Sequence, residues 1–309
     1  MKIYKPEFWD KNYPTIYSIL LLPVSYFYQI IIFIKNLFVK KIGFSIPVIC
    51  VGNIYIGGTG KTPISIKCKE LLSEICKPVI IKKNYKNHID EIELLKKNSK
   101  VIVSDTRRLG IEEAINKDFN FAILDDGYQD NSIKKDLNLV CFNNEQLVGN
   151  GLTLPSGPLR ENLSKIKNCN IVLINGKKNN EFEDKLKKYN VNLKFFYFNY
   201  YLKNFGELKN RKLVCFAGIG NPENFFNLLK ANRLNVIKEI KFPDHYNYSD
   251  DDLENLLKIE EKYNGKLVTT EKDFLRISQF KRKRFSFIPI KVNIDREEEF
   301  LKHLSKILK

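Results

Sequence analysis

The sequence predicts an α/β protein: a mainly parallel sheet with helices on both faces, two lobes, and a preceding N-terminal membrane helix. Apolar strand-like runs alternate with helical patterns along most of the chain, which is typical of parallel sheets covered by helices. A polar stretch rich in asparagine and lysine near Gly176–Lys188 divides this pattern into two halves. The 309 residues are 43% apolar, which is enough to bury a large core and excludes a disordered chain.

The first element is an uncharged segment of twenty residues from Thr15 to Ile34. A helix needs about 20 apolar residues to cross the hydrocarbon core of a bilayer. A buried helix of a soluble core usually carries a polar stripe, whereas here only Ser18, Ser25 and Gln29 interrupt the apolar surface. The pattern therefore favours a membrane helix over core burial. Three lysines precede the segment and three follow it, so whether it spans the bilayer or lies in one leaflet stays open.

The next elements follow from short apolar runs that alternate with longer helical patterns. In the first half, strands are expected at Val48–Val51, Pro78–Ile81, Val101–Val103, Phe121–Leu124 and Leu139–Phe142, with helices at Thr62–Ile75 and Ile111–Asn116. In the second half, strands are expected at Ile171–Ile174, Leu213–Ala217, Asn235–Ile240 and Leu267–Thr269, with a helix at 221–233. The expected domains are a membrane-associated segment at 1–42, a nucleotide-binding lobe at 43–176 and a second α/β lobe at 177–309.

The stretch "VGNIYIGGTGKTP" at 51–63 follows the first of these strands and leads into a helical pattern. Its glycines would let backbone N–H groups approach phosphate oxygens at a helix N-terminus, while lysine offers a point charge and threonine a hydroxyl for Mg²⁺. The commonest phosphate loop has glycine where this chain has Tyr55, yet the order of strand, loop and helix is the required one. The expected nucleotide-binding residues are Gly57, Gly58, Thr59, Gly60, Lys61 and Thr62.

A second polar feature, "FAILDDGYQD" at 121–130, places Asp125 and Asp126 at the C-terminal end of an apolar strand. Ligands of open α/β sheets bind at this end of the strands, and adjacent carboxylates can hold Mg²⁺ there. Together with Thr62 they form the expected metal site. The combination of a phosphate loop and an acidic strand end predicts a P-loop NTPase-like fold that binds ATP and Mg²⁺.

Charge and cysteine content limit the other classes of function. The net charge of +16 would suit nucleic acid, an anionic membrane or a phosphorylated substrate. Nucleic acid is not expected, because the charges are scattered and the aromatic residues fall in apolar runs. The six cysteines form no C-x-x-C pair, which indicates reduced core residues in a cytosolic domain, and three histidines without a His/Cys cluster give no support to a zinc site. No obligate protein partner is inferred.

The chain resembles the tetraacyldisaccharide 4'-kinases, which phosphorylate the lipid A precursor at the inner membrane of Gram-negative bacteria. The resemblance rests on the N-terminal apolar segment, "VGNIYIGGTGKTP" and "DDGYQD". It continues with "GNGLTLPSGPLRE" (149–161), "FAGIGNPENFF" (216–226), "FPDHYNY" (242–248) and "LVTTEKDFLRI" (267–277). It implies transfer of the γ-phosphate of ATP to the 4'-hydroxyl of an acylated glucosamine disaccharide 1-phosphate, giving lipid IVA, by a domain on the cytoplasmic face of the inner membrane.

The resemblance also implies residue roles. Asp90 and His245 would activate the sugar hydroxyl and Lys61 would act on the phosphates, while Arg160 and Glu161 would line the nucleotide cleft. The chain departs from the family after the second strand, where "KKNYKNHIDEI" replaces Arg-Gly-Tyr-Gly, and at Asp130, which replaces a histidine. The alternative is a membrane-tethered P-loop ATPase or nucleotide-binding regulator without sugar-lipid kinase activity.

Overall fold

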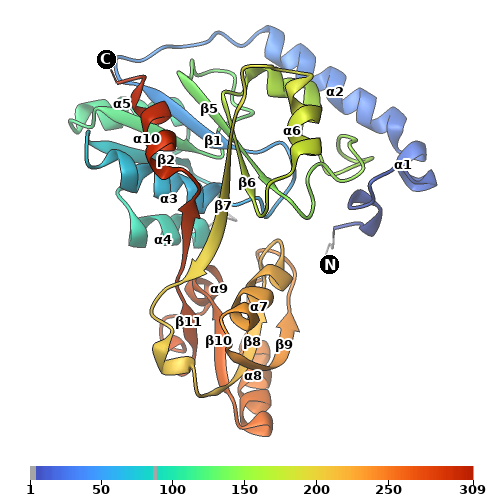
Figure 1. The fold of residues 1–309 in the computed structure, drawn as a ribbon, viewed down its shortest axis with the longest axis vertical. Coiled ribbons are helices and arrows are strands. Elements are labelled where there is room, and N and C mark those ends of the chain that lie inside the picture. Colours follow the sequence, from blue (N-terminus) through green and yellow to red (C-terminus); the bar gives the residue numbers. More distant parts are fainter. Residues whose placement is uncertain (1–4, 86–88, 309) are drawn as a thin grey trace. The chain divides into compact units, whose positions relative to one another are not determined.

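A computed structural model describes residues 5–85 and 89–308, which form two compact units. The larger unit contains residues 5–84, 99–199 and 294–308, and the smaller unit contains the described residues of 85–98 together with 200–293. This division differs from the expected linear one at 176, because a segment from the first half joins the smaller unit and the C-terminus returns to the larger one. Figure 1 shows the element order along the chain.

The N-terminal segment does not form the single continuous helix that the sequence predicts. A 3-10 helix, η1 (Glu7–Trp9), precedes α1 (Ile16–Leu20), and α2 (Leu22–Leu37) follows a break at Leu21. Pro23 lies in the first turn of α2, where its missing N–H is tolerated but cannot extend the preceding helix. The sequence left open whether this segment spans the bilayer or lies in one leaflet; within residues 5–85 and 89–308, no helix has both the length and the apolarity to cross a bilayer.

Helices α1 and α2 turn their polar residues toward the rest of the larger unit. Ser18 and Ser25 are buried, and Ser25 Oγ donates to Ser156 Oγ over 2.7 Å. Gln29 donates to the hydroxyl of Thr153, and Asn150 donates to Ser18. The outer face of both helices is apolar and exposed; it comprises Ile16, Tyr17, Ile19, Leu20, Val24, Tyr26, Phe27, Ile30, Ile31, Phe33, Ile34 and Leu37. An amphipathic helix on a soluble protein usually turns its apolar face to the core and its polar face to solvent, whereas α1 and α2 do the opposite.

The larger unit is built on a sheet whose strand order is β12-β7-β6-β5-β1-β4-β2-β3, of which residues 200–202 of β7 and 290–293 of β12 are assigned to the smaller unit. The strands are β1 (Val48–Gly52), β2 (Pro78–Lys83), β3 (Val101–Ser104), β4 (Phe121–Asp125), β5 (Leu137–Asn143), β6 (Ile171–Asn175), β7 (Lys194–Leu202) and β12 (Ile290–Ile294). From β3 to β7 every neighbouring pair is parallel, in agreement with the prediction. Their near-continuous apolar composition is what a sheet covered on both faces requires.

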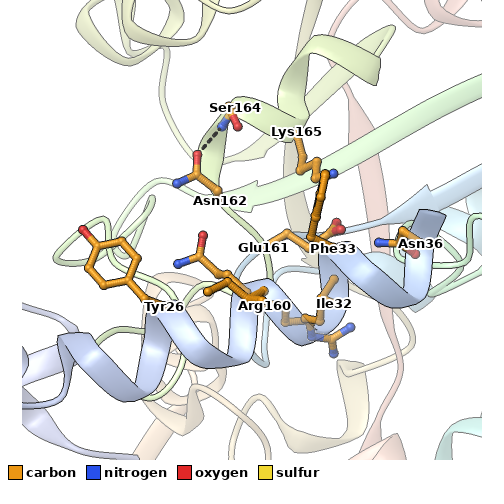
Figure 2. A pocket seen from close by; sticks show the side chains of 11 residues that line it. Tyr26, Ile32, Phe33, Asn36, Arg160, Glu161, Asn162, Ser164 and Lys165 are labelled. Atoms are coloured by element: carbon orange, nitrogen blue, oxygen red, sulfur yellow. Dashed lines mark hydrogen bonds between the residues drawn. The ribbon is translucent and has the colours of Figure 1, made fainter.

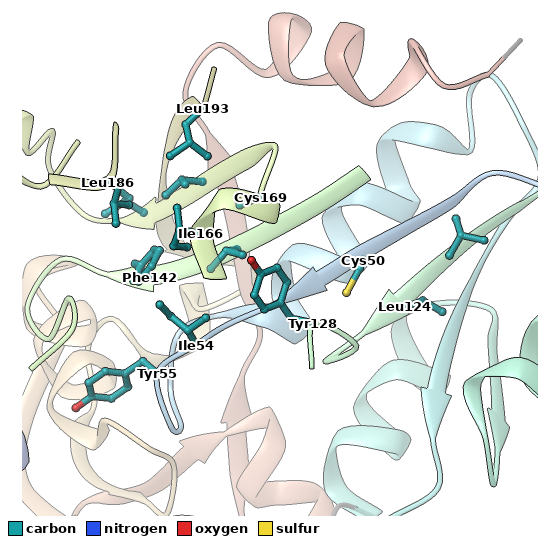
Figure 3. Close-up of a cluster of buried hydrophobic side chains, with 14 of the residues drawn as sticks. Cys50, Ile54, Tyr55, Leu124, Tyr128, Phe142, Ile166, Cys169, Leu186 and Leu193 are labelled. Atoms are coloured by element: carbon teal, nitrogen blue, oxygen red, sulfur yellow. The ribbon is translucent and has the colours of Figure 1, made fainter. Parts of the chain in front are cut away.

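Helices cover both faces of this sheet. Val48 and Cys50 of β1 belong to an apolar cluster that also includes residues of α5 (Arg107–Asn116) and α6 (Asn180–Lys187), part of which Figure 3 shows. On the other face, Phe196 of β7 packs edge-on against Phe300 of α10 (Glu297–Ser305), next to α3 (Lys61–Leu72). The alternation of side chains along each strand produces this two-sided core. A 3-10 helix, η2 (Leu163–Asn168), completes the unit.

The smaller unit contains a second parallel sheet of order β11-β10-β8-β9. Its strands are β8 (Lys212–Ala217), β9 (Asn235–Lys241), β10 (Lys266–Thr270) and β11 (Ser286–Ile288). Alternate residues of β8 contact α7 (Pro222–Ala231) in one cluster and α8 (Asp250–Tyr263) in another, so helices again cover both faces. The remaining elements are α4 (Ile89–Asn98), α9 (Glu271–Arg276), η3 (Gly206–Leu208) and η4 (Arg282–Arg284).

Candidate active site

The predicted phosphate loop connects the buried strand β1 to α3, as expected. Gly60 caps α3 with φ 88°, and Gly57 has φ 80°. Both lie in the left-handed region that glycine adopts without steric cost, which explains the residue type at these positions. The Asn53 side chain braces the loop from inside, donating to the Thr59 hydroxyl over 2.9 Å. The first backbone N–H groups of α3 and the Lys61 side chain therefore lie directly after an ordered loop, where a phosphate group could bind.

Asp125, the last residue of β4, is fully buried next to the first turn of α3. Its Oδ2 accepts from the Thr62 hydroxyl over 3.1 Å and its Oδ1 from Ser65 over 2.9 Å. The ammonium group of Lys82, near the end of β2, lies 2.7 Å from Oδ2, and this lysine is only 1% exposed. Burial of two charged groups is costly, and each compensates the other here, so removing one would leave its partner buried without an opposing charge.

The Lys82–Asp125 pair gives a first prediction, about stability. Asp125→Asn should lower the free energy of unfolding by about 3–5 kcal/mol, because the Lys82 ammonium would stay buried without the opposing charge. Asp118→Asn is the matched control: Asp118 is exposed, and its positive φ suits asparagine equally well, so the change should stay within about 0.5 kcal/mol. Urea unfolding followed by circular dichroism measures both. A loss below about 1 kcal/mol for Asp125→Asn would show that the charge pair does not hold this strand end.

Asp126 follows in a left-handed backbone conformation, φ 57°, which turns its side chain toward the phosphate loop. Its Oδ1 accepts from Arg160 Nη1 over 2.8 Å and lies 3.9 Å from Lys61 Nζ. Burial alone would raise the pKa of Asp126, but Lys61, Arg160 and Lys82 outweigh it and lower the pKa to about 2. The carboxylate is therefore ionised at physiological pH and surrounded by cations that can also serve phosphate.

Arg160 and Glu161 lie at the C-terminal end of the loop at 149–161, which forms hydrogen bonds with α1 and α2. Glu161 is buried, and this burial raises the pKa of its carboxyl group. Both residues line a cavity of about 460 Å³, which Figure 2 shows beside helix α2. The lining residues are Tyr26, Gln29, Ile30, Ile32, Phe33, Asn36, Arg160, Glu161, Asn162, Ser164 and Lys165. Arg160 thus links the Asp126 carboxylate to an amphipathic cavity.

The two residues expected to activate a hydroxyl come together in the smaller unit. Asp90, in the first turn of α4, is 4% exposed, and its Oδ1 lies 3.4 Å from His245 Nδ1. Its Oδ2 accepts from Arg276 of α9 through Nη2 and Nε, at 2.5 and 3.1 Å. Burial works against ionisation of Asp90, but the hydrogen bond from His245 and the charges of Lys272 and Arg276 hold its pKa well below the usual range.

His245 occupies an unusual backbone conformation for a non-glycine residue, with φ 56°. Its N–H donates to the carbonyl of Gly218 over 3.2 Å, which holds the turn in place. Such strain tends to occur at functional sites, where the surrounding structure compensates for it. The Lys272 ammonium lies 3.4 Å from His245 Nε2 and 3.3 Å from a Glu91 oxygen, so both ring nitrogens have charged neighbours.

The structure therefore assembles the predicted residues in two groups, one in each unit. Four further residues of these groups were not expected from the sequence: Ser65, Lys82, Lys272 and Arg276. A signal existed for Lys82, which directly follows the apolar run of β2, and for Lys272 and Arg276, which lie in the motif "LVTTEKDFLRI". Asp130, the departure from the family pattern, forms an ion pair with the buried Arg107 at 3.2 Å. The carboxylate at this position is thus neutralised by a neighbouring guanidinium.

The residues expected to hold a metal suit Mg²⁺ by their chemistry. Thr62, Asp125 and Asp126 offer only oxygen atoms, which this hard cation prefers. Among the described residues, no group of three or more His, Cys, Asp or Glu side chains could enclose a metal ion. Mg²⁺ is usually held by one or two carboxylates together with substrate phosphates instead of a complete protein cage.

Comparison with known proteins gives one consistent result. Residues 17–309 match the family model described as tetraacyldisaccharide-1-P 4'-kinase. The chain is 41% identical to the tetraacyldisaccharide 4'-kinase of Pelagibacter ubique over 99% of both chains, and 32% identical to that of Rickettsia bellii over 90% of each. Its fold is similar to that of LpxK from Aquifex aeolicus, crystallised in complex with ATP, with a TM-score of 0.73 and 26% identity over 94% of this chain and 99% of that one. The chain therefore belongs to the tetraacyldisaccharide 4'-kinase family.

Proposed function

We propose that the protein transfers the γ-phosphate of ATP to the 4'-hydroxyl of tetraacyldisaccharide 1-phosphate, giving lipid IVA and ADP in lipid A biosynthesis. The observation that carries this proposal is the phosphate loop of β1 and α3 beside the buried Asp125, in a chain whose relatives bear this activity in their names. The solved relative from Aquifex aeolicus is described as a complex with ATP, which supports the nucleotide as the donor.

The larger unit would bind the nucleotide. The backbone N–H groups at the start of α3 and the Lys61 ammonium would hold the β- and γ-phosphates, with Gly57, Gly58 and Gly60 allowing close approach. Arg160 would add a cation for the charge that develops on the transferred group. Mg²⁺, held by Thr62 and by Asp125 or Asp126, would neutralise charge between the β- and γ-phosphates.

The smaller unit would supply the groups that accept the proton of the acceptor. The sugar hydroxyl has a pKa far above 7, so attack on the phosphorus is faster when a base takes its proton. Asp90 and His245 form a hydrogen-bonded pair of the right chemistry, in which the ionised carboxylate can stabilise the imidazole ring after it has taken the proton.

We further propose that α1 and α2 bring the enzyme to the cytoplasmic face of the bacterial inner membrane by lying in one leaflet. Sixteen residues of α2 rise by only about 24 Å, less than the roughly 30 Å of a bilayer core, so insertion along the surface fits better than crossing. The exposed apolar face described above supports this position, because a helix in the interface buries such a face among acyl chains. The cavity beside α2 joins apolar walls to Arg160 and Lys165, which would suit an acylated and phosphorylated sugar.

The proposed activity is tested by incubating the purified full-length protein with Mg-ATP and tetraacyldisaccharide 1-phosphate. The expected result is a 4'-phosphorylated product whose formation requires the acceptor. Absence of product, while another kinase of the family phosphorylates the same acceptor preparation, would refute the proposal. Release of phosphate from ATP without any acceptor would instead indicate the regulatory ATPase that the sequence left as the alternative.

Membrane association gives a second prediction. The double variant Phe27→Glu, Ile31→Glu should weaken binding to vesicles of phosphatidylethanolamine and phosphatidylglycerol at least about 10-fold, because each apolar side chain contributes roughly 1.5–3 kcal/mol when buried. Phe280→Glu removes an equally apolar side chain that is 96% exposed in the smaller unit and should leave binding unchanged. Vesicle co-sedimentation measures both. Equal binding by the double variant and the wild type would show that this face does not enter the bilayer.

A further inference from the structure

We propose that Arg276 is a positioning residue of the phosphoryl transfer: it holds one oxygen of Asp90 so that the other oxygen orients the imidazole ring of His245. The two donors Nε and Nη2 of Arg276 converge on Asp90 Oδ2, at 3.1 and 2.5 Å. Asp90 Oδ1, on the other side of the carboxylate, lies 3.4 Å from His245 Nδ1. The inference rests on the proposed function, in which His245 and Asp90 act on the acceptor hydroxyl.

Arg276 is itself held in one orientation. It is largely buried, with a side chain only 6% exposed, and its Nη1 donates to the Gly218 carbonyl over 2.6 Å and to Asp273 Oδ1 over 2.9 Å. Asp273 is fully buried and also accepts from Tyr248, from Thr270 and from the backbone of Gly218. A planar guanidinium fixed at both ends transmits its orientation to its partner, which the flexible ammonium of a lysine cannot do as well.

Gly218 connects this support directly to His245. The carbonyl that accepts from Arg276 Nη1 also accepts from the His245 backbone N–H. A Cβ atom at position 218 would lie 3.0 Å from the Tyr248 hydroxyl and 3.1 Å from an Asp273 oxygen, so a larger residue would crowd both groups. Arg276 therefore contacts both members of the pair, Asp90 by its side chain and His245 through a shared backbone acceptor.

The charges around the ring assign a role to each nitrogen. His245 Nδ1 lies 3.4 Å from Asp90 Oδ1 and 3.4 Å from Arg276 Nη2. His245 Nε2 lies 3.4 Å from Lys272 Nζ, 3.9 Å from a Glu91 oxygen and 3.8 Å from an Asp244 oxygen. A proton on Nδ1 is stabilised by the adjacent ionised carboxylate, and this tautomer leaves the lone pair on Nε2.

In the proposed reaction, His245 acts as the base for the acceptor hydroxyl. The acceptor O–H gives its proton to His245 Nε2, while the oxygen forms a bond to the γ-phosphorus. The bond from that phosphorus to the β–γ bridging oxygen breaks, and ADP leaves with the electron pair. Asp90, which stays ionised, stabilises the imidazolium until it returns its proton to solvent.

The decisive measurement is nitrogen NMR of the histidine ring. The chain has only three histidines, so His245 can be assigned by comparison with His245→Asn. In the wild type, the neutral ring should carry its proton mainly on Nδ1; in Arg276→Met the proportion should shift toward Nε2. The same variant should lower kcat by about 10-fold to 100-fold, leave KM for ATP within about 2-fold, and move the acidic limb of the pH–rate profile. Arg276→Lys keeps a cation and most of the packing, so it should show the same ring change with a smaller loss of kcat.

The control is Arg284→Met, which removes an exposed guanidinium from the same unit and should change neither the ring nor the rate. An unchanged Nδ1 tautomer and pH–rate profile in both folded Arg276 variants would overturn the proposal. If Arg276→Met does not fold, Arg276→Lys alone decides the question. The ring measurement needs no substrate, so a wild-type protein that lacks kinase activity would refute the proposed function without altering the result for Arg276.

Discussion

Replacing Lys61 with alanine is expected to lower kcat about 100-fold to 1,000-fold, because the first residue of α3 would no longer offer a fixed charge to the outer phosphates. The side chain is already ordered before substrate binds: it is 13% exposed, with its ammonium 3.9 Å from Asp126 Oδ1. The charge therefore needs little rearrangement as the transition state forms. Steady-state phosphorylation of the lipid acceptor measures the loss, and calorimetric titration with ATP separates it from weaker nucleotide binding.

Lys69→Ala provides the matched control, since it removes the same charge from the last turn of the same helix. Activity and melting temperature of this variant should remain close to those of the wild type. The fold of Lys61→Ala should also be intact, because Asp126 keeps Arg160 as its partner at 2.8 Å. If Lys61→Ala kept kcat within about 3-fold of the wild type, the loop would bind something other than the transferred phosphate.

The strands could be predicted from sequence because buried parallel strands are short, apolar and locally encoded. Every expected strand, from Val48–Val51 to Leu267–Thr269, coincides with an observed one. The helices expected at Thr62–Ile75, Ile111–Asn116 and 221–233 are likewise confirmed as α3, α5 and α7. The aromatic strand β7 and the two later strands β11 and β12 were not expected. The neighbour of β12 in its sheet, β7, lies far away in the chain, and runs as short as β11 and β12 carry little periodicity.

The orientation of the apolar N-terminal segment depends on contacts that its sequence pattern does not reveal. An almost wholly apolar run predicts burial in lipid or protein, and in this chain the three polar side chains decide which face turns inward. Ser18, Ser25 and Gln29 all bond to the larger unit, a preference that periodicity alone does not reveal. The helix break, by contrast, had a local signal in Pro23, whose ring is incompatible with a helix interior.

The candidate site likewise contains residues that could be predicted from sequence and residues that could not. The glycines, Lys61 and the Asp125–Asp126 pair belong to contiguous motifs with a clear chemical purpose, so they were visible in the sequence. The ion pairs that control the charge of these groups join residues distant in the chain: Lys82 with Asp125, and Arg276 with Asp90, which are 43 and 186 positions apart. Burial of such cations is a property of the folded structure, because lysine and arginine are usually exposed.

Replacing Asp90 with alanine is expected to lower kcat about 100-fold to 10,000-fold, the contribution typical of a positioned acid–base group. The carboxylate would no longer orient His245 or stabilise the proton on its ring. Because His245, Lys272 and Arg276 together hold the pKa of Asp90 far below neutrality, the wild-type group does not titrate near physiological pH. The loss in Asp90→Ala should therefore not follow a titration of Asp90 itself; the acidic limb of the pH–rate profile should move, as in Arg276→Met, because the carboxylate that stabilises the ring proton is gone, and ATP affinity should be unaffected. Acceptor phosphorylation at several pH values measures the effect.

Glu93→Ala is the matched control, since it deletes a carboxylate from the same helix, where the Glu93 side chain is 44% exposed and pairs with Lys96. Its rate should equal that of the wild type. Removing Asp90 leaves Arg276 with Asp273 and the Gly218 carbonyl, so the variant should lose about 1–3 kcal/mol of stability yet remain folded. Wild-type turnover by folded Asp90→Ala would exclude this carboxylate from the reaction. That outcome would also mean that His245 needs no carboxylate partner for its part in the reaction.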